Sequence, residues 1–126
     1  MQRRSDLAFE AAAAHYAAQA VFPARVNEAL LDRLLLVKQC PQVIVDIGAG
    51  CGYGSQVLRQ HYPKAQILSI DRNLAMVSQA SSDITRICAD AHQLPLPDAS
   101  VDMVYANLMM PWGNVARLCR EWRRVL

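Results

Sequence analysis

The sequence has little net charge and no long apolar run, and both shortages exclude classes of protein. Its formal net charge is +2, which is too small a surplus to indicate a nucleic-acid partner. No apolar stretch approaches the roughly 20 residues that a membrane-spanning helix needs. We therefore expect neither a nucleic acid nor a membrane among the partners of this protein.

Cysteine is also sparse and follows no pattern. The four cysteines are scattered, without a C-x-x-C pair or a nearby histidine pattern, which argues against a zinc site and a disulfide framework. We expect no bound metal ion and a reduced, cytoplasmic location. Because 53% of the 126 residues are hydrophobic and 19% are charged, the chain is predicted to form one globular domain with a modest core.

Helical and strand patterns alternate along the chain. Apolar residues at helical spacing predict helices at residues 7–19, 25–37, 54–62, 74–80 and 114–125, with Pro23 as a break between the first two. Short apolar and β-branched runs predict strands at residues 42–47, 65–70, 84–89 and 101–106. This alternation predicts an α/β fold with a parallel sheet and right-handed crossovers.

Glycine is scarce overall, but four of the five glycines fall in the stretch VDIGAGCGYGS, directly after the first predicted strand. A dinucleotide fingerprint, G-x-G-x-x-G, would need a glycine where Tyr53 stands. The carboxylate of Asp46 lies inside the motif and would repel a pyrophosphate. A phosphate-free ligand with a cationic end, such as S-adenosylmethionine, suits the spacing D-x-G-x-G-x-G better. The glycines would let the backbone lie against it.

Polar residues also follow the later strands. Asp71 comes nineteen residues after Gly52, where a carboxylate can bind both hydroxyls of a ribose. Asp90 can accept a hydrogen bond from an adenine amino group, and the Ala91 amide can reach a ring nitrogen. Either acid taken alone could instead be a helix cap or a turn residue. Together with the glycine loop they match an adenosine that carries a short charged arm.

These segments carry a family resemblance. VDIGAGCGYGS, SIDRNLAMVSQA, ADAHQLPLPDASVDMVYANL and the closing REWRRVL resemble, in order and spacing, the class I S-adenosylmethionine-dependent methyltransferases. AFEAAAAHYAAQAVFPARVNEALLDRL and YANLMMPWGNVARLCREWRRVL look like the malonyl-acyl-carrier-protein O-methyltransferases of biotin synthesis. The resemblance implies a Rossmann-like sheet at residues 41–126 and leading helices at residues 1–40 that act as a cofactor lid.

The resemblance also assigns roles to residues around the cofactor. The methionine part would lie against Asp46, Gly48, Ala49, Gly50 and Gly52, the ribose on Asp71, and the adenine on Asp90 and Ala91, flanked by Arg72 and Met76. Asn107 would lie beside the sulfonium and its methyl group, and Tyr16 would close over the cofactor from the leading helices. The three histidines are expected to be surface or loop residues.

The implied substrate is a small-molecule or acyl-carrier-protein-bound carboxylate. A carboxylate is already a nucleophile at neutral pH, so the reaction needs alignment and desolvation rather than a general base, and we expect no catalytic acid or base. Three alternatives stay open. The first is another small-molecule class I methyltransferase, and the second is a cofactor-binding module without turnover. The third is an NAD(P)-binding oxidoreductase domain, which Asp71 with Arg72 favours and Tyr53 with Asp46 disfavours.

Members of the resembling family continue beyond a segment like RVL with further strands, so the chain is expected to correspond to the amino-terminal part of a methyltransferase, truncated after the fourth strand and its helix. The strand at 101–106 would then have an exposed edge. We expect either self-association through that edge or its cover by residues 108–112 and the last helix.

Overall fold

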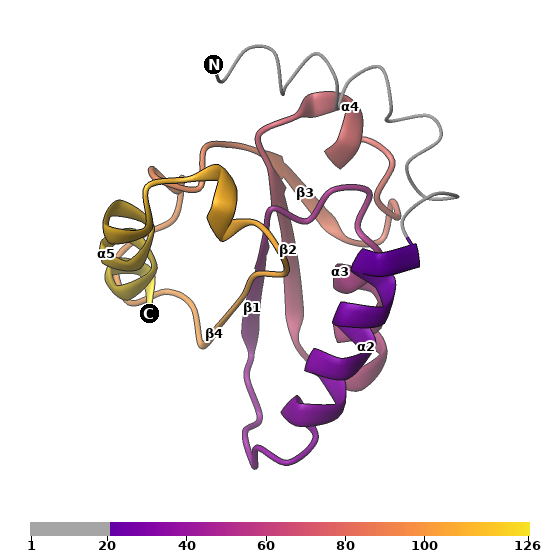
Figure 1. The fold of residues 1–126 in the computed structure, drawn as a ribbon. Helices are drawn as coiled ribbons and strands as arrows, with labels where there is room; N and C mark the ends of the chain where they lie inside the picture. The colour runs from indigo at the N-terminus through magenta and orange to yellow at the C-terminus, as the bar shows by residue number, and fades with distance from the viewer. Residues whose placement is uncertain (1–20) are drawn as a thin grey trace.

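The computed structural model describes residues 21–126, which form a parallel sheet with helices on both faces (Figure 1). The predicted helix at 7–19 and Tyr16 lie outside the described residues. The helical elements are α2 (Val21–Leu34), α3 (Tyr53–His61), α4 (Leu74–Val77), a short 3-10 turn η1 (Met110–Trp112) and α5 (Val115–Val125). The strands are β1 (Val43–Ile47), β2 (Gln66–Asp71), β3 (Thr85–Cys88) and β4 (Met103–Tyr105).

The four strands are all parallel and lie in the order β3-β2-β1-β4. The predicted α/β fold with a parallel sheet is therefore confirmed. The chain runs outward from β1 through β2 to β3 and then returns to place β4 on the other side of β1. This reversal makes the carboxyl ends of β1 and β4 a topological switch point, where ligands of open α/β sheets bind.

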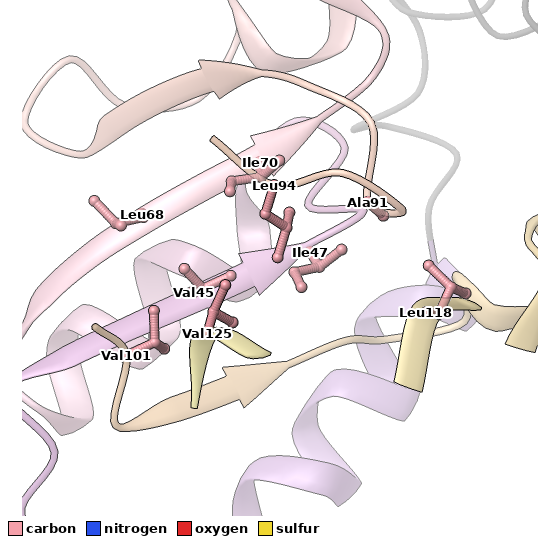
Figure 2. Packing of buried hydrophobic residues seen from close by; sticks show 9 residues of the cluster. All are labelled: Val45, Ile47, Leu68, Ile70, Ala91, Leu94, Val101, Leu118 and Val125. Atoms are coloured by element: carbon pink, nitrogen blue, oxygen red, sulfur yellow. The ribbon is translucent and has the colours of Figure 1, made fainter. Parts of the chain in front are cut away.

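Side chains alternate between the two faces of the sheet, as the period of two in a strand requires. Ile44, Ile67 and Met103 pack with Leu31 of α2 and Leu58 of α3 on one face. The opposite face packs under the segment that follows β3 and under α5, as Figure 2 shows. Its buried members are Val45, Ile47, Leu68, Ile70, Ala91, Leu94, Val101, Leu118 and Val125. Helix α2 thus belongs to the same core as the sheet.

Several predicted boundaries were wrong, for local reasons. Pro23 lies inside α2 and does not precede it. Strand β4 starts at Met103 instead of Val101, because the amide of Val101 donates to the carbonyl of Val125 at the end of α5 (3.0 Å). Helix α4 spans four residues and ends at Val77, short of the predicted 80.

Strand β4 is an edge strand of the sheet formed by the described residues. Its side chains Met103 and Tyr105 are buried on the α2 and α3 face, and Val104 packs against the cluster under α5. The last helix thus packs against one face of the strand, and cover of its backbone edge stays a prediction. Self-association through the backbone edge stays a prediction.

Candidate functional site

The glycine loop after β1 has a backbone that only glycine adopts easily. Gly48, Gly50 and Gly52 have φ values of 69°, 56° and 85°, all in the left-handed region that disfavours other residues. A Cβ on Gly48 would lie 2.5 Å from the Met109 Cβ, and one on Gly52 would lie 2.6 Å from the Ala80 Cβ. The first and last of these glycines are thus required by both conformation and space.

Asp71, at the end of β2, holds this loop in place. Its Oδ2 accepts a hydrogen bond from the Gly50 amide (2.9 Å), and its Oδ1 accepts one from the Asn73 amide (2.8 Å). The Ala49 amide also donates to the Ile70 carbonyl at 3.0 Å. A carboxylate oxygen can accept two hydrogen bonds, so each oxygen of this half-buried carboxylate can take one further donor. Two vicinal hydroxyls of a ribose supply two such donors.

Asp90 and Ala91 follow β3 along the same edge of the sheet. The Asp90 side chain is 67% exposed, and its Oδ1 accepts hydrogen bonds from the His92 amide (2.8 Å) and from His92 Nδ1 (2.7 Å). These bonds to His92 lower the pKa of Asp90, so the carboxyl is ionised at neutral pH. His92 was expected to be a surface or loop residue. It lies in a loop, as expected, but its side chain is largely buried and bonded to Asp90.

Asp46 lies beneath the loop rather than on its open side. The carboxylate is 3% exposed, and its Oδ2 accepts a hydrogen bond from Ser55 Oγ (2.7 Å) at the start of α3. Burial raises the pKa of Asp46 to about 6, although the bond from Ser55 opposes the rise. At neutral pH the ionised form therefore prevails, and its negative charge lies beside Gly54 and Ser55, directly after the loop.

Two further side chains complete this buried cluster. The Tyr105 hydroxyl donates to Asn27 Oδ1 of α2 at 2.6 Å. A Cβ on Gly54 would lie 3.2 Å from Asn27 Oδ1, 3.2 Å from Asp46 Oδ2 and 3.4 Å from Tyr105 Cε1. Burial and the Asp46 charge raise the pKa of Tyr105, so its hydroxyl stays protonated. The sequence interpretation missed Asn27 and Tyr105 as supports of the loop.

The remaining predicted residues lie around the same edge. Met76 is buried at 3% exposure, and its Sδ accepts a weak bond from Cys51 Sγ (3.9 Å), while Arg72 is exposed beside Asp90. Asn107 is half-buried in the segment after β4, and the next residue, Leu108, has a φ of 58°. A left-handed residue other than glycine is typical of functional loops. Nothing is described for Tyr16.

The acidic groups at this edge fit S-adenosylmethionine better than a dinucleotide. Asp71 keeps acceptor capacity for ribose hydroxyls, and the exposed Asp90 carboxylate can accept from an amino group. The buried Asp46 charge behind the glycines favours a cation and opposes a pyrophosphate.

Within residues 21–126, no helix is both long enough and apolar enough to cross a membrane.

Comparison with known proteins decides the family. A family model described as "Methyltransferase domain" matches residues 45–126. The chain belongs to this methyltransferase family. The match confirms the predicted resemblance, and S-adenosylmethionine rather than a dinucleotide is the cofactor of the family.

Individual relatives agree with this assignment. The chain is 36% identical over 118 residues to a malonyl-[acyl-carrier protein] O-methyltransferase of Methylovorus sp. (strain MP688), covering 84% of this chain and 40% of that protein. The chain spans less than half the length of the curated relatives that it matches.

Two solved structures share the fold. One is described as a complex between the Haloferax volcanii Trm112 methyltransferase activator and "the putative methyltransferase", with a TM-score of 0.78, 24% identity and coverage of 94% of this chain and 55% of that chain. The other is an S-adenosyl-L-methionine-dependent methyltransferase of Methanococcus maripaludis, with a TM-score of 0.68, 21% identity and coverage of 98% and 58%. At these identities the likeness supports the fold alone. It confirms the predicted Rossmann-like methyltransferase sheet.

Proposed function

We propose that the protein transfers a methyl group from S-adenosylmethionine to the free carboxylate of a small acid carried as a thioester on an acyl carrier protein. The observation that carries the cofactor half of this proposal is Asp71, which fixes the glycine loop and keeps acceptor capacity for a ribose. The acceptor half is supported by the name of the relatives that match at 36% identity.

Different residues would bind different parts of the cofactor. The loop of Asp46, Gly48, Ala49, Gly50 and Gly52 would hold the methionine part, and Asp71 would accept from the ribose hydroxyls. Asp90, the Ala91 amide, Arg72 and Met76 would bind the adenine, and Asn107 would lie beside the sulfonium. Each of these groups lies on the edge formed by the carboxyl ends of the strands or in the segments that follow them.

The electrostatics of the edge favour a cationic ligand. Asp46 lies behind the glycine loop, and its pKa is raised partly by the nearby charge of Asp71. Two acids that affect one another in this way create a region of negative potential at the loop. When bound, S-adenosylmethionine supplies an electrophilic methyl group on a sulfonium, whose positive charge the acids would stabilise.

A carboxylate acceptor explains why no general base is needed. Tyr105 and His92 are two candidate bases at this edge, and both are engaged: the Tyr105 hydroxyl donates to Asn27, and both ring nitrogens of His92 have hydrogen-bond partners. An ionised carboxylate attacks without loss of a proton, so the chain has to align the reactants and exclude water.

A cytoplasmic location and a role of residues 1–40 as a lid over the cofactor are further proposals.

Methyl transfer should be measured directly, with radiolabelled S-adenosylmethionine and malonyl-acyl-carrier protein, beside unloaded carrier protein and an Asp71→Ala variant. The proposal predicts a base-labile methyl ester on the loaded carrier only, and its loss in the variant. Binding of S-adenosylhomocysteine without transfer to the loaded carrier would contradict the proposed reaction. It would favour a second candidate, a cofactor-binding module without turnover.

A further inference from the structure

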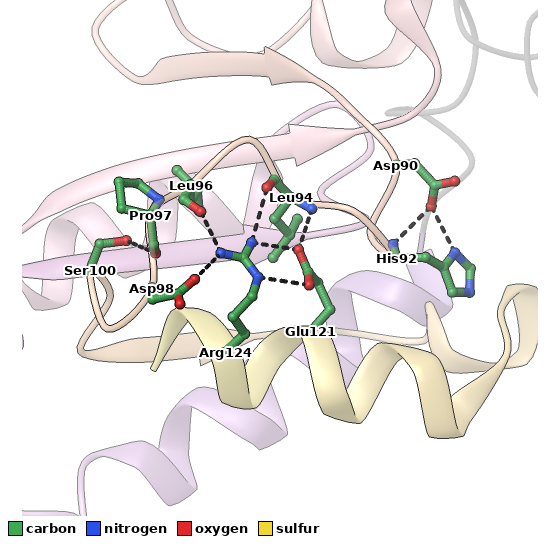
Figure 3. A network of polar contacts seen from close by, with 9 residues as sticks. All are labelled: Asp90, His92, Leu94, Leu96, Pro97, Asp98, Ser100, Glu121 and Arg124. Carbon is green, nitrogen blue, oxygen red and sulfur yellow. Dashed lines mark hydrogen bonds and ion pairs between the residues drawn. The ribbon is translucent and has the colours of Figure 1, made fainter.

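His92 connects the segment after β3 to the start of α5, and both of its ring nitrogens have partners. Figure 3 shows its contacts with Asp90. Nδ1 lies 2.7 Å from Asp90 Oδ1, and Nε2 lies 2.9 Å from the backbone nitrogen of Asn114. The side chain is 13% exposed. The ring therefore bridges the proposed adenine acid and the cap residue of α5.

The partners of the ring select one tautomer. A backbone N–H can only donate, so Nε2 must accept from the Asn114 amide and carries no proton. The proton of a neutral ring is then on Nδ1, which donates to Asp90 Oδ1. The Asn114 side chain caps α5 by accepting from the Arg117 amide at 3.1 Å, so the residue that donates to the ring is itself held by the helix.

Close packing fixes the ring in this position. A Cβ on Gly113 would lie 3.0 Å from His92 Nε2 and 2.7 Å from Leu118 Cδ1, so a larger residue at 113 would displace the ring. Both hydrogen bonds from His92 to Asp90 reach Oδ1, which occupies the two acceptor positions of that oxygen. Oδ2 of the same exposed carboxylate is the oxygen that can accept from a ligand.

A second connection holds the same segment to α5. Glu121 Oε1 accepts from the Leu94 amide at 2.7 Å, and Arg124 donates to the Leu94 and Leu96 carbonyls at 3.2 and 2.9 Å (Figure 3). Only His92, however, contacts Asp90 itself among these groups. The Glu121 and Arg124 contacts fix the path of the segment, and His92 fixes the carboxylate.

We propose that His92 is a positioning residue that fixes the Asp90 carboxylate so that Oδ2 accepts from the adenine amino group, and thereby determines selectivity for adenine over its 6-oxo analogue. The inference rests on the proposed function, because it takes Asp90 as the adenine acid. It predicts that His92 affects binding only through the amino group that Asp90 recognises.

The test is calorimetric titration of the chain with S-adenosylhomocysteine and with S-inosylhomocysteine, in which an oxo group replaces the amino group. His92→Ala should weaken S-adenosylhomocysteine about tenfold, as for the loss of one hydrogen bond to a charged group, and leave the inosine analogue unchanged. His92→Asn places an amide N–H near the position of Nδ1 and should restore most of the affinity. His61→Ala, at the exposed end of α3, is the matched control and should change neither ligand.

Equal weakening of both ligands by His92→Ala, or no rescue by asparagine, would mean a structural role only and would overturn the proposal. A spectroscopic test needs no ligand: nitrogen NMR should show His92 with a protonated Nδ1 and an unprotonated Nε2 at pH 7.5, and the opposite tautomer would also overturn it. If the wild-type chain bound neither ligand, the proposed function would fail, and the tautomer would still support or refute the placement of His92.

Discussion

Replacement of the buried Asp46 by asparagine should stabilise the protein at neutral pH. The carboxylate is 3% exposed, and burial raises its pKa from 3.8 to about 6. Between these values the native state binds more protons than the unfolded state, so the free energy of unfolding contributed by this group falls as the pH rises. A shift of this size corresponds to about 3 kcal/mol across the window. Asparagine carries no charge, and its side-chain oxygen can still accept from Ser55 Oγ.

The assay is urea unfolding of the wild type and Asp46→Asn at several pH values between 3.5 and 8. At each pH, the free energy of unfolding of wild type is subtracted from that of Asp46→Asn. This difference should increase by about 3 kcal/mol between pH 4 and a pH above 6, and it should stay constant at higher pH. Asp32→Asn, an exposed carboxylate on α2, controls for the change in net charge and should follow the wild-type curve. A difference between Asp46→Asn and wild type that does not change with pH would mean that the pKa of Asp46 is not raised in the folded protein.

Three further substitutions test the loop and its supports. Asp71→Asn replaces one acceptor oxygen by an NH₂ donor that faces a backbone amide. The affinity for S-adenosylhomocysteine, measured by calorimetry, should therefore fall about ten- to hundredfold. Unchanged affinity would exclude the ribose role of Asp71. Gly52→Ala forces a Cβ to 2.6 Å from the Ala80 Cβ at a φ of 85°. The free energy of unfolding, measured with denaturant, should therefore fall by about 2–4 kcal/mol. A wild-type unfolding midpoint would argue against the loop conformation. Tyr105→Phe leaves the buried Asn27 Oδ1 without the hydroxyl donor of Tyr105. The same assay should show that the free energy of unfolding falls by about 1–3 kcal/mol. No change would mean that this hydrogen bond does not stabilise the fold.

The fold was largely predictable because its signals are local. Alternating apolar runs located all four strands, and the cluster of glycines marked the loop after β1. Asp71 was identifiable because an acid that follows the second strand of a parallel sheet lies at the same edge as the loop. Strand ends were less accurate, since the start of β4 depends on a hydrogen bond to Val125 far along the chain.

The supporting residues could not be predicted from local pattern. Asn27 looks like any polar position of an amphipathic helix, and only the packing of α2 against Tyr105 gives it a role. His92 stands two residues after Asp90 in a loop, and its second partner, Asn114, is 22 residues away. The contact between Met109 and Gly48 was also unpredictable from local pattern, because it forms only when β4 pairs with β1.

The central claim is that the edge formed by the glycine loop, Asp71 and Asp90 binds S-adenosylmethionine. The first measurement is calorimetric titration with S-adenosylhomocysteine, beside NAD and an Asp71→Ala variant. We expect the wild-type chain to bind S-adenosylhomocysteine, the variant to lose most of this affinity, and NAD to show no comparable binding. Binding of NAD in preference, or no binding of S-adenosylhomocysteine by a chain that is demonstrably folded, would contradict it.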